Sequence, residues 1–142
     1  MSQILFRLKT EITQSETKGE IRPATSQDME LIKKWIKNFY KEALKTQPPN
    51  LDRPPHETEE YVQLYLWWHE NQPTAMGMIN KNRLNLIYTP PPLRNKGYGR
   101  AITAALARLV QEKGQTPVLH TKSNNTAAIG LYTSLGFTVQ NR

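Results

Sequence analysis

The chain has 142 residues, contains no cysteine and carries a formal net charge of +7. A chain of this length forms one domain and can bury a single core without help from disulfides or metals. Without cysteine, disulfides, thiolate metal sites and a cysteine nucleophile are excluded, and we expect no metal site. No leader sequence and no run of about 18 apolar residues is visible, which predicts a cytoplasmic protein without a membrane segment.

Charge is unevenly distributed along the chain. Residues 1–80 contain 10 Lys or Arg against 11 Asp or Glu, whereas residues 81–142 contain 9 Lys or Arg against one acid, Glu112. A polyanionic small ligand or a nucleic acid would account for the basic half, and so would a solvated face without a partner. A nucleic acid is disfavoured because the basic residues gather at one loop and are not interleaved with aromatic residues.

The first third of the chain combines two short extended segments with one helix. Residues 3–12 alternate loosely and predict a strand, and a polar link leads to a second short strand at 20–23. Residues 25–28, Thr-Ser-Gln-Asp, have the cap-and-acid pattern of a helix start. Apolar residues then keep helical spacing from Met29 to Leu44 with lysines between them, which predicts an amphipathic surface helix.

The middle of the chain is less regular. Residues 46–55 contain four prolines and predict a loop within the domain that is long enough to be functional. Residues 56–63 fit a short helix and residues 64–70 an aromatic-rich strand. A single helix over 56–71 fits the periodicity nearly as well.

The second half contains the clearest strand and helix signals. A helix at 98–113 ends at Gly114, and a last helix begins at a cap, Asn124 or Asn125, and ends at Gly136. Strands at both ends of the chain around one strand–helix–strand crossover predict an α/β fold with a mixed sheet and helices on both faces. The four strands predicted in this half are residues 74–80, 84–89, 116–122 and 137–140.

Residues 86–100, LIYTPPPLRNKGYGR, join a buried strand to a helix through a short basic loop with two glycines. About four N–H groups lack a partner in the first turn of a helix, where the peptide dipoles place roughly +0.5 charge. Glycines allow an anion to approach these groups closely. The Lys-Ser/Thr ending of a triphosphatase loop and the third Gly of a dinucleotide fingerprint are both absent. The glycines and cations of this predicted anion site are Gly97, Gly99, Arg94, Lys96 and Arg100.

At these residues the chain resembles the GNAT acyltransferase superfamily, whose pyrophosphate loop has the form Arg/Gln-x-x-Gly-x-Gly/Ala. A second element of that family follows at residues 125–137, NTAAIGLYTSLGF. Tyr88-Thr-Pro-Pro resembles the branch in which this domain is the C-terminal half of a two-domain acetyltransferase. The resemblance, which runs from about Gly19 to the end, implies a GNAT-like fold: a mostly antiparallel sheet with helices on both faces and a parallel strand pair splayed at the coenzyme site.

The same resemblance implies an N-acyltransferase that transfers an acetyl group from acetyl-CoA to a primary amine of an unidentified acceptor. The main chain of residues 86–88 would pair with the pantetheine arm like an added strand, and Asn125 would contact the same arm. A non-catalytic acyl-CoA binding or sensing domain is the alternative, because it would keep the loop without a base. The implied coenzyme-binding residues are Leu86, Ile87, Tyr88, Arg94, Asn95, Lys96, Gly97, Tyr98, Gly99, Arg100, Asn125 and Ala128.

Tyr132 occupies the family's position for the residue that faces the thioester sulfur, and a phenol with a reference pKa of about 10 can protonate a leaving thiolate. Many family members place a carboxylate base on the strand entering the loop, but residues 84–89 contain none. The remaining bases are His69 or Glu70 on an earlier strand and His120 after the long helix. Such a site weakly favours an amine of low pKa, because an amine of pKa about 10.4 is neutral at pH 7 in only roughly 1 molecule in 2,500.

One departure from the family concerns the end of the sheet. GNAT chains close with a further strand after the Gly-Phe motif, whereas this sequence stops at Arg142. Because exposed strand edges are rarely tolerated, we expect residues 3–12 to cover an edge, in the same chain or across a homodimer. The chain is then one domain over residues 1–142 in which 1–18 form an added strand and link. The resemblance also favours a helix and then a strand over 56–70.

Overall fold

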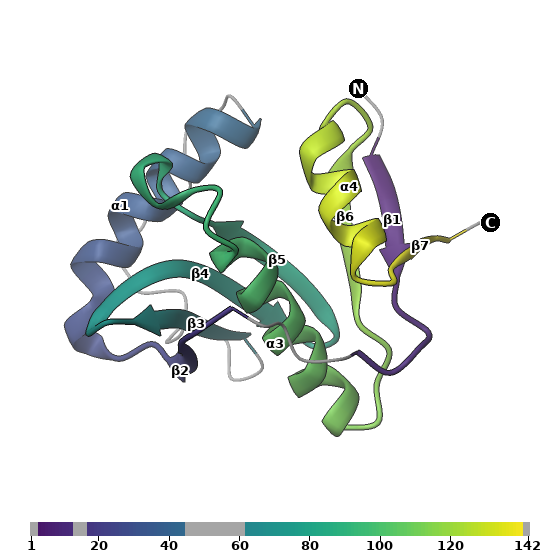
Figure 1. Ribbon diagram of the computed structural model, residues 1–142, viewed down its shortest axis with the longest axis horizontal. Helices are drawn as coiled ribbons and strands as arrows, with labels where there is room; N and C mark the ends of the chain where they lie inside the picture. The colour runs from purple at the N-terminus through teal and green to yellow at the C-terminus, as the bar shows by residue number, and fades with distance from the viewer. Residues whose placement is uncertain (1–2, 13–16, 45–61, 141–142) are drawn as a thin grey trace.

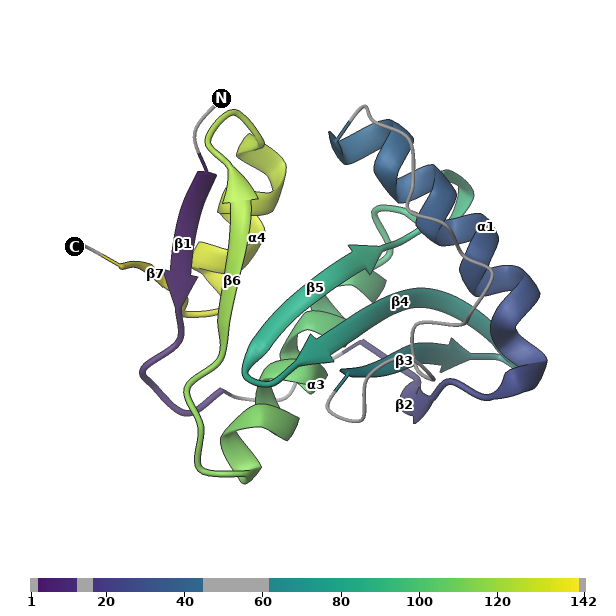
Figure 2. The same ribbon diagram turned by 180° about the vertical axis from the view of Figure 1, so that it is seen from behind.

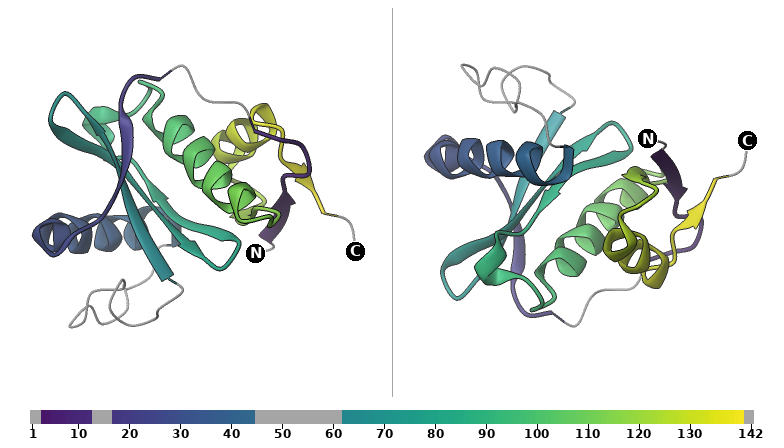
Figure 3. Two further views of the ribbon diagram at one scale, coloured as in Figure 1. Left: turned by 90° about the horizontal axis from the view of Figure 1, so that it is seen from below. Right: turned by 90° about the horizontal axis from the view of Figure 1, so that it is seen from above.

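The computed structural model describes residues 3–12, 17–44 and 62–140. In this part of the chain seven strands form one sheet in the order β2-β3-β4-β5-β6-β1-β7 (Figure 1). All neighbouring strands are antiparallel except β5 and β6, which are parallel. Helix α1 lies on one face of the sheet and α3 and α4 on the other (Figure 3). The predicted mixed α/β sheet is confirmed.

The helices and strands follow the order expected from the sequence. The strands are β1 (Gln3–Arg7), β2 (Glu20–Pro23), β3 (Val62–His69), β4 (Gln72–Asn80), β5 (Arg83–Tyr88), β6 (Val118–Lys122) and β7 (Thr138–Val139). The α-helices are α1 (Met29–Phe39), α3 (Tyr98–Glu112) and α4 (Thr126–Ser134). Short turns of helix are η1 (Ser26–Asp28), η2 (Tyr40–Leu44), which extends α1 with π geometry, and η3 (Pro91–Leu93).

Several predicted boundaries differ from the structure by one or two residues, and two further differences change the extent or the type of an element. The strand predicted over 3–12 ends at Arg7, after which Leu8 keeps a single backbone bond to the carbonyl of Pro117. Residues 62 and 63, predicted to end a helix, begin β3, because their backbone pairs with β4 as far as Asn80. The rest of that predicted helix and the Pro-rich loop at 46–55 lie outside the described residues.

Helix α1 packs on the face formed by β3, β4 and β5. Thr25 begins η1 through a capping box, in which the carboxylate of Asp28 accepts from the Thr25 backbone N–H at 2.8 Å. The buried face of α1 then meets apolar side chains of these three strands. This face of the helix consists of Met29, Ile32, Trp35 and Ile36.

Helix α3 packs on the opposite face, against β4 and β5. Its fully buried Ile102 and Leu106 belong to a core that also contains Phe6 and Leu119. A Cβ added to Gly77 of β4 would come within 2.4 Å of the Leu106 side chain, so glycine allows the helix to approach the sheet closely. Burial of a Leu or Ile side chain contributes about 1.5–3 kcal/mol, which fixes α3 and the loop before it relative to β5.

Strands β5 and β6 separate soon after they begin. Their only pairing in the described chain is Arg83 with Val118, and beyond it the two strands diverge (Figure 2). The backbone edge of β5 that faces β6 therefore has no strand partner along most of its length. The splayed parallel pair implied by the resemblance is confirmed.

Strand β1 lies inside the sheet, between β6 and β7. It pairs antiparallel with β6 from Gln3 opposite Lys122 to Arg7 opposite Val118, and with β7 through Phe6 and Arg7. The N-terminal strand therefore covers the free edge of β6 within the same chain, as expected. β7, of two residues, becomes the edge strand, and short edge strands are a common protection against pairing between molecules.

Candidate functional site

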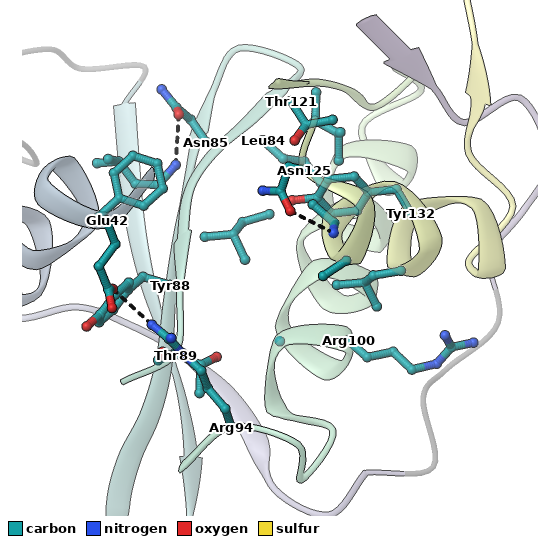
Figure 4. Close-up of a pocket in the computed structure, with 18 of the residues that line it drawn as sticks. Glu42, Leu84, Asn85, Tyr88, Thr89, Arg94, Arg100, Thr121, Asn125 and Tyr132 are labelled. Carbon is teal, nitrogen blue, oxygen red and sulfur yellow. Dashed lines mark hydrogen bonds and ion pairs between the residues drawn. The ribbon is translucent and has the colours of Figure 1, made fainter. Parts of the chain in front are cut away.

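A cleft of about 900 Å³ opens where β5 and β6 separate (Figure 4). The ends of α1 and η2 border it on one side, and the first turns of α3 and α4 on the other. Most predicted site residues line this cleft: Leu86, Ile87, Tyr88, Arg94, Asn95, Gly97, Tyr98, Gly99, Arg100, His120, Asn125, Ala128 and Tyr132. Lys96, His69 and Glu70 are outside this lining.

The start of α3 has the backbone geometry expected of an anion site. Gly97, the residue before the helix, is left-handed with φ of 88°, and its carbonyl accepts a hydrogen bond from the Thr17 hydroxyl at 3.1 Å. A Cβ added to Gly97 would come within 2.6 Å of that hydroxyl. At Gly99 an added Cβ would meet only the Thr89 hydroxyl, at 3.6 Å. The Thr17 hydroxyl thus fixes the backbone at Gly97, whereas the space beside Gly99 is open. The free N–H groups of this first turn of α3 can receive a phosphate there.

The cations of the loop differ in their partners. The Arg94 guanidinium forms an ion pair with Glu42 at 2.9 Å, donates to the carbonyl of Thr89 at 2.8 Å and lies over the Tyr88 ring. Arg100 donates to the Ser134 hydroxyl and thereby joins α3 to α4. The charge of Arg94 is therefore largely compensated, and the Arg100 side chain is directed away from the cleft toward the last residue of α4 (Figure 4). Backbone N–H groups at the start of α3 are then the main positive element of the loop.

Glu42 is a cleft residue that sequence reasoning missed. It lies in η2, 52 positions before Arg94, and no local pattern relates the two residues. Burial, and then the carboxylate of Glu42, raise the pKa of the nearby Tyr88 phenol. This cluster connects the end of the first helix to the loop before α3 (Figure 4).

Strand β5 is irregular at the cleft. Its pairing with β4 shifts between Met76 opposite Tyr88 and Met78 opposite Asn85, so that two residues of β5 lie opposite Gly77. Leu86 has a φ of 51°, and its N–H donates to the side-chain oxygen of Asn85 at 2.8 Å. A bulge of this kind turns backbone groups out of the ladder, and strained non-glycine residues gather at functional sites. Asn85 was not predicted, because a bulge depends on pairing with another strand.

Tyr132 lies on α4 between the cleft and the core. Its ring packs edge-on against Phe6 of β1, with centroids 6.0 Å apart, and tilted against Phe137. Burial raises the pKa of the Tyr132 phenol to about 12. The hydroxyl therefore stays protonated across the physiological range and can act as a proton donor.

The structure distinguishes between the three candidate bases, His69, Glu70 and His120, by their positions relative to the cleft. Glu70 follows β3 in a turn with φ of 52°, and its side chain is 79% exposed. Nδ1 of His69 is 2.8 Å from the hydroxyl of Tyr98, so this ring is engaged at the start of α3. His120 lines the cleft, and partial burial followed by the charge of Arg83 lowers the pKa of its imidazole. A neutral imidazole in the cleft can accept a proton.

The described residues contain no group of three His, Cys, Asp or Glu that could hold a metal ion. Within the same residues, no helix has the length and apolar character needed to cross a membrane.

Comparisons with known proteins match one family model and several relatives, of which the chain spans only part of the length. A family model described as FR47-like protein matches residues 57–142. The chain is 33% identical over 89 residues to the uncharacterized protein YyaT of Bacillus subtilis, covering 59% of this chain and 58% of that protein. It is also 33% identical over 72 residues to a mycothiol acetyltransferase of Arthrobacter, covering 50% of this chain and 22% of the relative.

Solved structures share the fold. A protein of Novosphingobium aromaticivorans assigned to the GNAT acetyltransferase family superposes with a TM-score of 0.72 at 22% identity, covering 98% of this chain and 60% of that protein. A predicted acetyltransferase from Clostridium acetobutylicum, crystallised with acetyl-CoA, superposes with a TM-score of 0.62 at 16% identity, covering 88% of this chain and 93% of that one.

Proposed function

Because this chain belongs to the FR47-like family of GNAT-type acetyltransferases, we propose that it transfers an acetyl group from acetyl-CoA to a primary amine. The observation that carries the proposal is the open first turn of α3 beside the unpaired edge of β5. The Arthrobacter relative, by its name an acetyltransferase, supports the reaction class. The Clostridium structure with acetyl-CoA supports the donor.

The residues of the cleft suit the parts of this donor. The N–H groups around Gly99 would hold the diphosphate, since a hydrogen bond to a charged group contributes about 1.5–3 kcal/mol, and Arg100 in the same turn would add positive charge. The free edge of residues 86–88 would pair with the amide groups of the pantetheine arm, as an added strand does. Asn125, whose side-chain oxygen caps α4 at the N–H of Ala128, lines the same part of the cleft.

Acetyl-CoA supplies an acetyl group activated as a thioester. As the carbon–nitrogen bond forms and the carbon–sulfur bond breaks, the acceptor nitrogen loses a proton and the coenzyme sulfur gains one. We assign the gain to Tyr132, because its phenol remains protonated and lines the cleft. We assign the loss to His120, directly or through water, because its imidazole is neutral near pH 7 and, unlike Glu70, lines the cleft.

A binding measurement tests the donor site. Calorimetry with acetyl-CoA should give saturable binding to the wild-type protein. Gly99→Leu should weaken it by at least about 10-fold, because the side chain fills the space where the diphosphate would lie. Gly130→Leu, on the exposed and open surface of α4, is the matched control and should bind like the wild type. Absence of binding to the wild type, or equal binding by the Gly99 variant, contradicts the proposed donor site.

A second measurement distinguishes an enzyme from a binding domain. Release of the coenzyme thiol in the presence of a panel of amines should exceed the release without an amine. A protein that binds acetyl-CoA but releases no thiol with any amine would instead be an acyl-CoA binding domain.

A further inference from the structure

The sheet around the cleft has one face that no described helix covers. Leu84, Leu119 and Phe6 point into the core under α3 and α4. Because successive side chains of a strand alternate between faces, their neighbours in β5, β6 and β1 point to the opposite side. Helix α1 packs only on β3, β4 and β5 of that side, and β6 and β1 lie apart from it (Figure 2). An acceptor can therefore approach the cleft over β6 and β1.

Cations dominate this uncovered face at the cleft. Arg83 on β5 and Lys122 on β6 line the cleft on either side of His120, and neither has an acidic partner among the described residues. Glu42 is the one carboxylate in the described lining, and Arg94 neutralises it at 2.9 Å. The described part of the acceptor side therefore carries uncompensated positive charge.

A third cation on this face also lacks a partner. Arg7 on β1 lies opposite Val118 on β6, and Val118 lies opposite Arg83 on β5. Arg7 and Arg83 therefore lie in one row across the sheet, with Val118 between them. The Nε atom of Arg7 is buried and has no hydrogen-bond partner among the described residues. Arg7 lies outside the cleft lining, so it adds positive charge behind the cleft and is not itself assigned a contact with the acceptor.

Positive charge beside the reacting amine has two consequences. It attracts an anionic group to the entrance. It also disfavours the ammonium form of the acceptor and so lowers the pKa of the amine. Both effects favour an acceptor that combines an amine with an anion, and disfavour polyamines and lysine-rich peptides.

We propose that the acceptor is a small amine that also carries an anionic oxygen group, a carboxylate or a phosphate, which Arg83 and Lys122 bind at the uncovered face of β5 and β6. The inference rests on the proposed acetyl transfer and specifies its substrate class. Arg83 and Lys122 are then the residues that determine acceptor specificity.

The kinetic test uses acceptors in pairs that differ in the anionic group: glycine with glycinamide, phenylalanine with phenylalaninamide, and O-phosphoethanolamine with ethanolamine. Because the anionic group also changes the amine pKa, kcat/KM for thiol release is expressed per concentration of neutral amine. For pairs that react, this value should be at least about 10-fold higher for the anionic member, as one charge-assisted hydrogen bond provides. The preference should approach one in Arg83→Gln/Lys122→Gln. Arg108→Gln, with its cation on α3 beside Glu112 and outside the cleft lining, is the control and should retain it.

A second readout does not require turnover. The pKa of the His120 imidazole is measured by following its NMR signals as the pH is varied, in the presence of acetate, of inorganic phosphate or of chloride at equal ionic strength. Acetate or phosphate should raise the pKa of His120 in the wild type, because a bound anion favours the imidazolium, and should not do so in the double variant. The more effective anion indicates whether the acceptor carries a carboxylate or a phosphate.

These outcomes separate the two proposals. Equal or better use of the neutral members overturns the anionic acceptor while acetyl transfer stands. If acetyl-CoA does not bind, acetyl transfer fails. If no pair reacts, the His120 titration decides, and a pKa that neither anion moves overturns the anion site.

Discussion

At the scale of single residues, a phenol and an imidazole whose pKa values are shifted in opposite directions line the same cleft. Tyr132 is held in its protonated form because burial raises its pKa to about 12. Partial burial and then the charge of Arg83 lower the pKa of the His120 imidazole, which favours its neutral form. Pairs of titratable groups whose environments displace their pKa values apart are typical of acid–base sites.

Replacing Tyr132 by phenylalanine removes the proposed proton donor and little else, since the ring and its contacts with Phe6 and Phe137 remain. We expect kcat to fall by about 10²-fold or more, with the dissociation constant of acetyl-CoA changed less than about 2-fold by calorimetry. Tyr65→Phe, which loses only an exposed hydrogen bond to Gln63 on β3, is the control. Wild-type turnover in Tyr132→Phe would remove the phenol from the mechanism.

The dependence of kcat/KM on pH tests His120. Its reference pKa of about 6.5 is lowered in the folded protein, so the neutral base is present above that value and is lost as the pH falls below it. Activity should therefore decline on the acid side with a pKa below 6.5, and Arg83→Gln should move this limb to higher pH. His120→Gln should abolish the limb. An unchanged acid limb in that variant would assign the base to another group.

At the scale of elements, the N-terminal strand connects the sheet to α4, the helix that carries Tyr132. Phe6 of β1 is fully buried and packs against Tyr132. β1 lies between β6 and β7 in the sheet and pairs with both of them. Loss of β1 would therefore open two strand edges and remove the support of α4.

Truncation of the Phe6 side chain tests this role. Phe6→Ala should lower the free energy of unfolding by about 3–5 kcal/mol, as for other buried phenylalanines, measured by urea denaturation. Val139 lies opposite Phe6 in the register and is 53% exposed, so Val139→Ala should change stability by less than about 1 kcal/mol. Equal effects of the two substitutions would show that β1 is peripheral to the fold. Deletion of residues 1–12 should cause aggregation or loss of the fold.

At the scale of the whole molecule, four of the nine cations of the C-terminal half line one cleft. Residues 81–142 have 9 Lys or Arg against one acid, and Arg83, Arg94, Arg100 and Lys122 line the cleft. A ligand with several phosphates gains from this field at a distance as well as on contact.

The affinity for acetyl-CoA should therefore depend on ionic strength. Screening shortens the range of these interactions from about 10 Å at 0.1 M salt to about 3 Å at 1 M, and we expect the dissociation constant to rise by about 10-fold over this interval. S-acetylpantetheine lacks the phosphates, so its weaker binding should change little. Parallel salt dependence of both ligands would contradict an electrostatic role for the basic half.

Much of the architecture could be predicted from local chemistry. The capping box at Thr25, the cap at Asn125 and the left-handed Gly136 follow from preferences within a few residues, and so does the loop before α3. The placement of η2 beside the loop, which joins Glu42 to Arg94, did not follow from any such pattern.

The sequence by itself determined most of the described elements, the glycine loop before α3 and the family, because hydrophobic periodicity, glycine positions and helix caps are properties of neighbouring residues. Only the tertiary structure decided that β1 enters the sheet between β6 and β7. It also decided that β5 bulges at Leu86 and that His120, not Glu70, lines the cleft. These features depend on strand pairing and on contacts between distant segments, whose free energy exists only once the chain has folded.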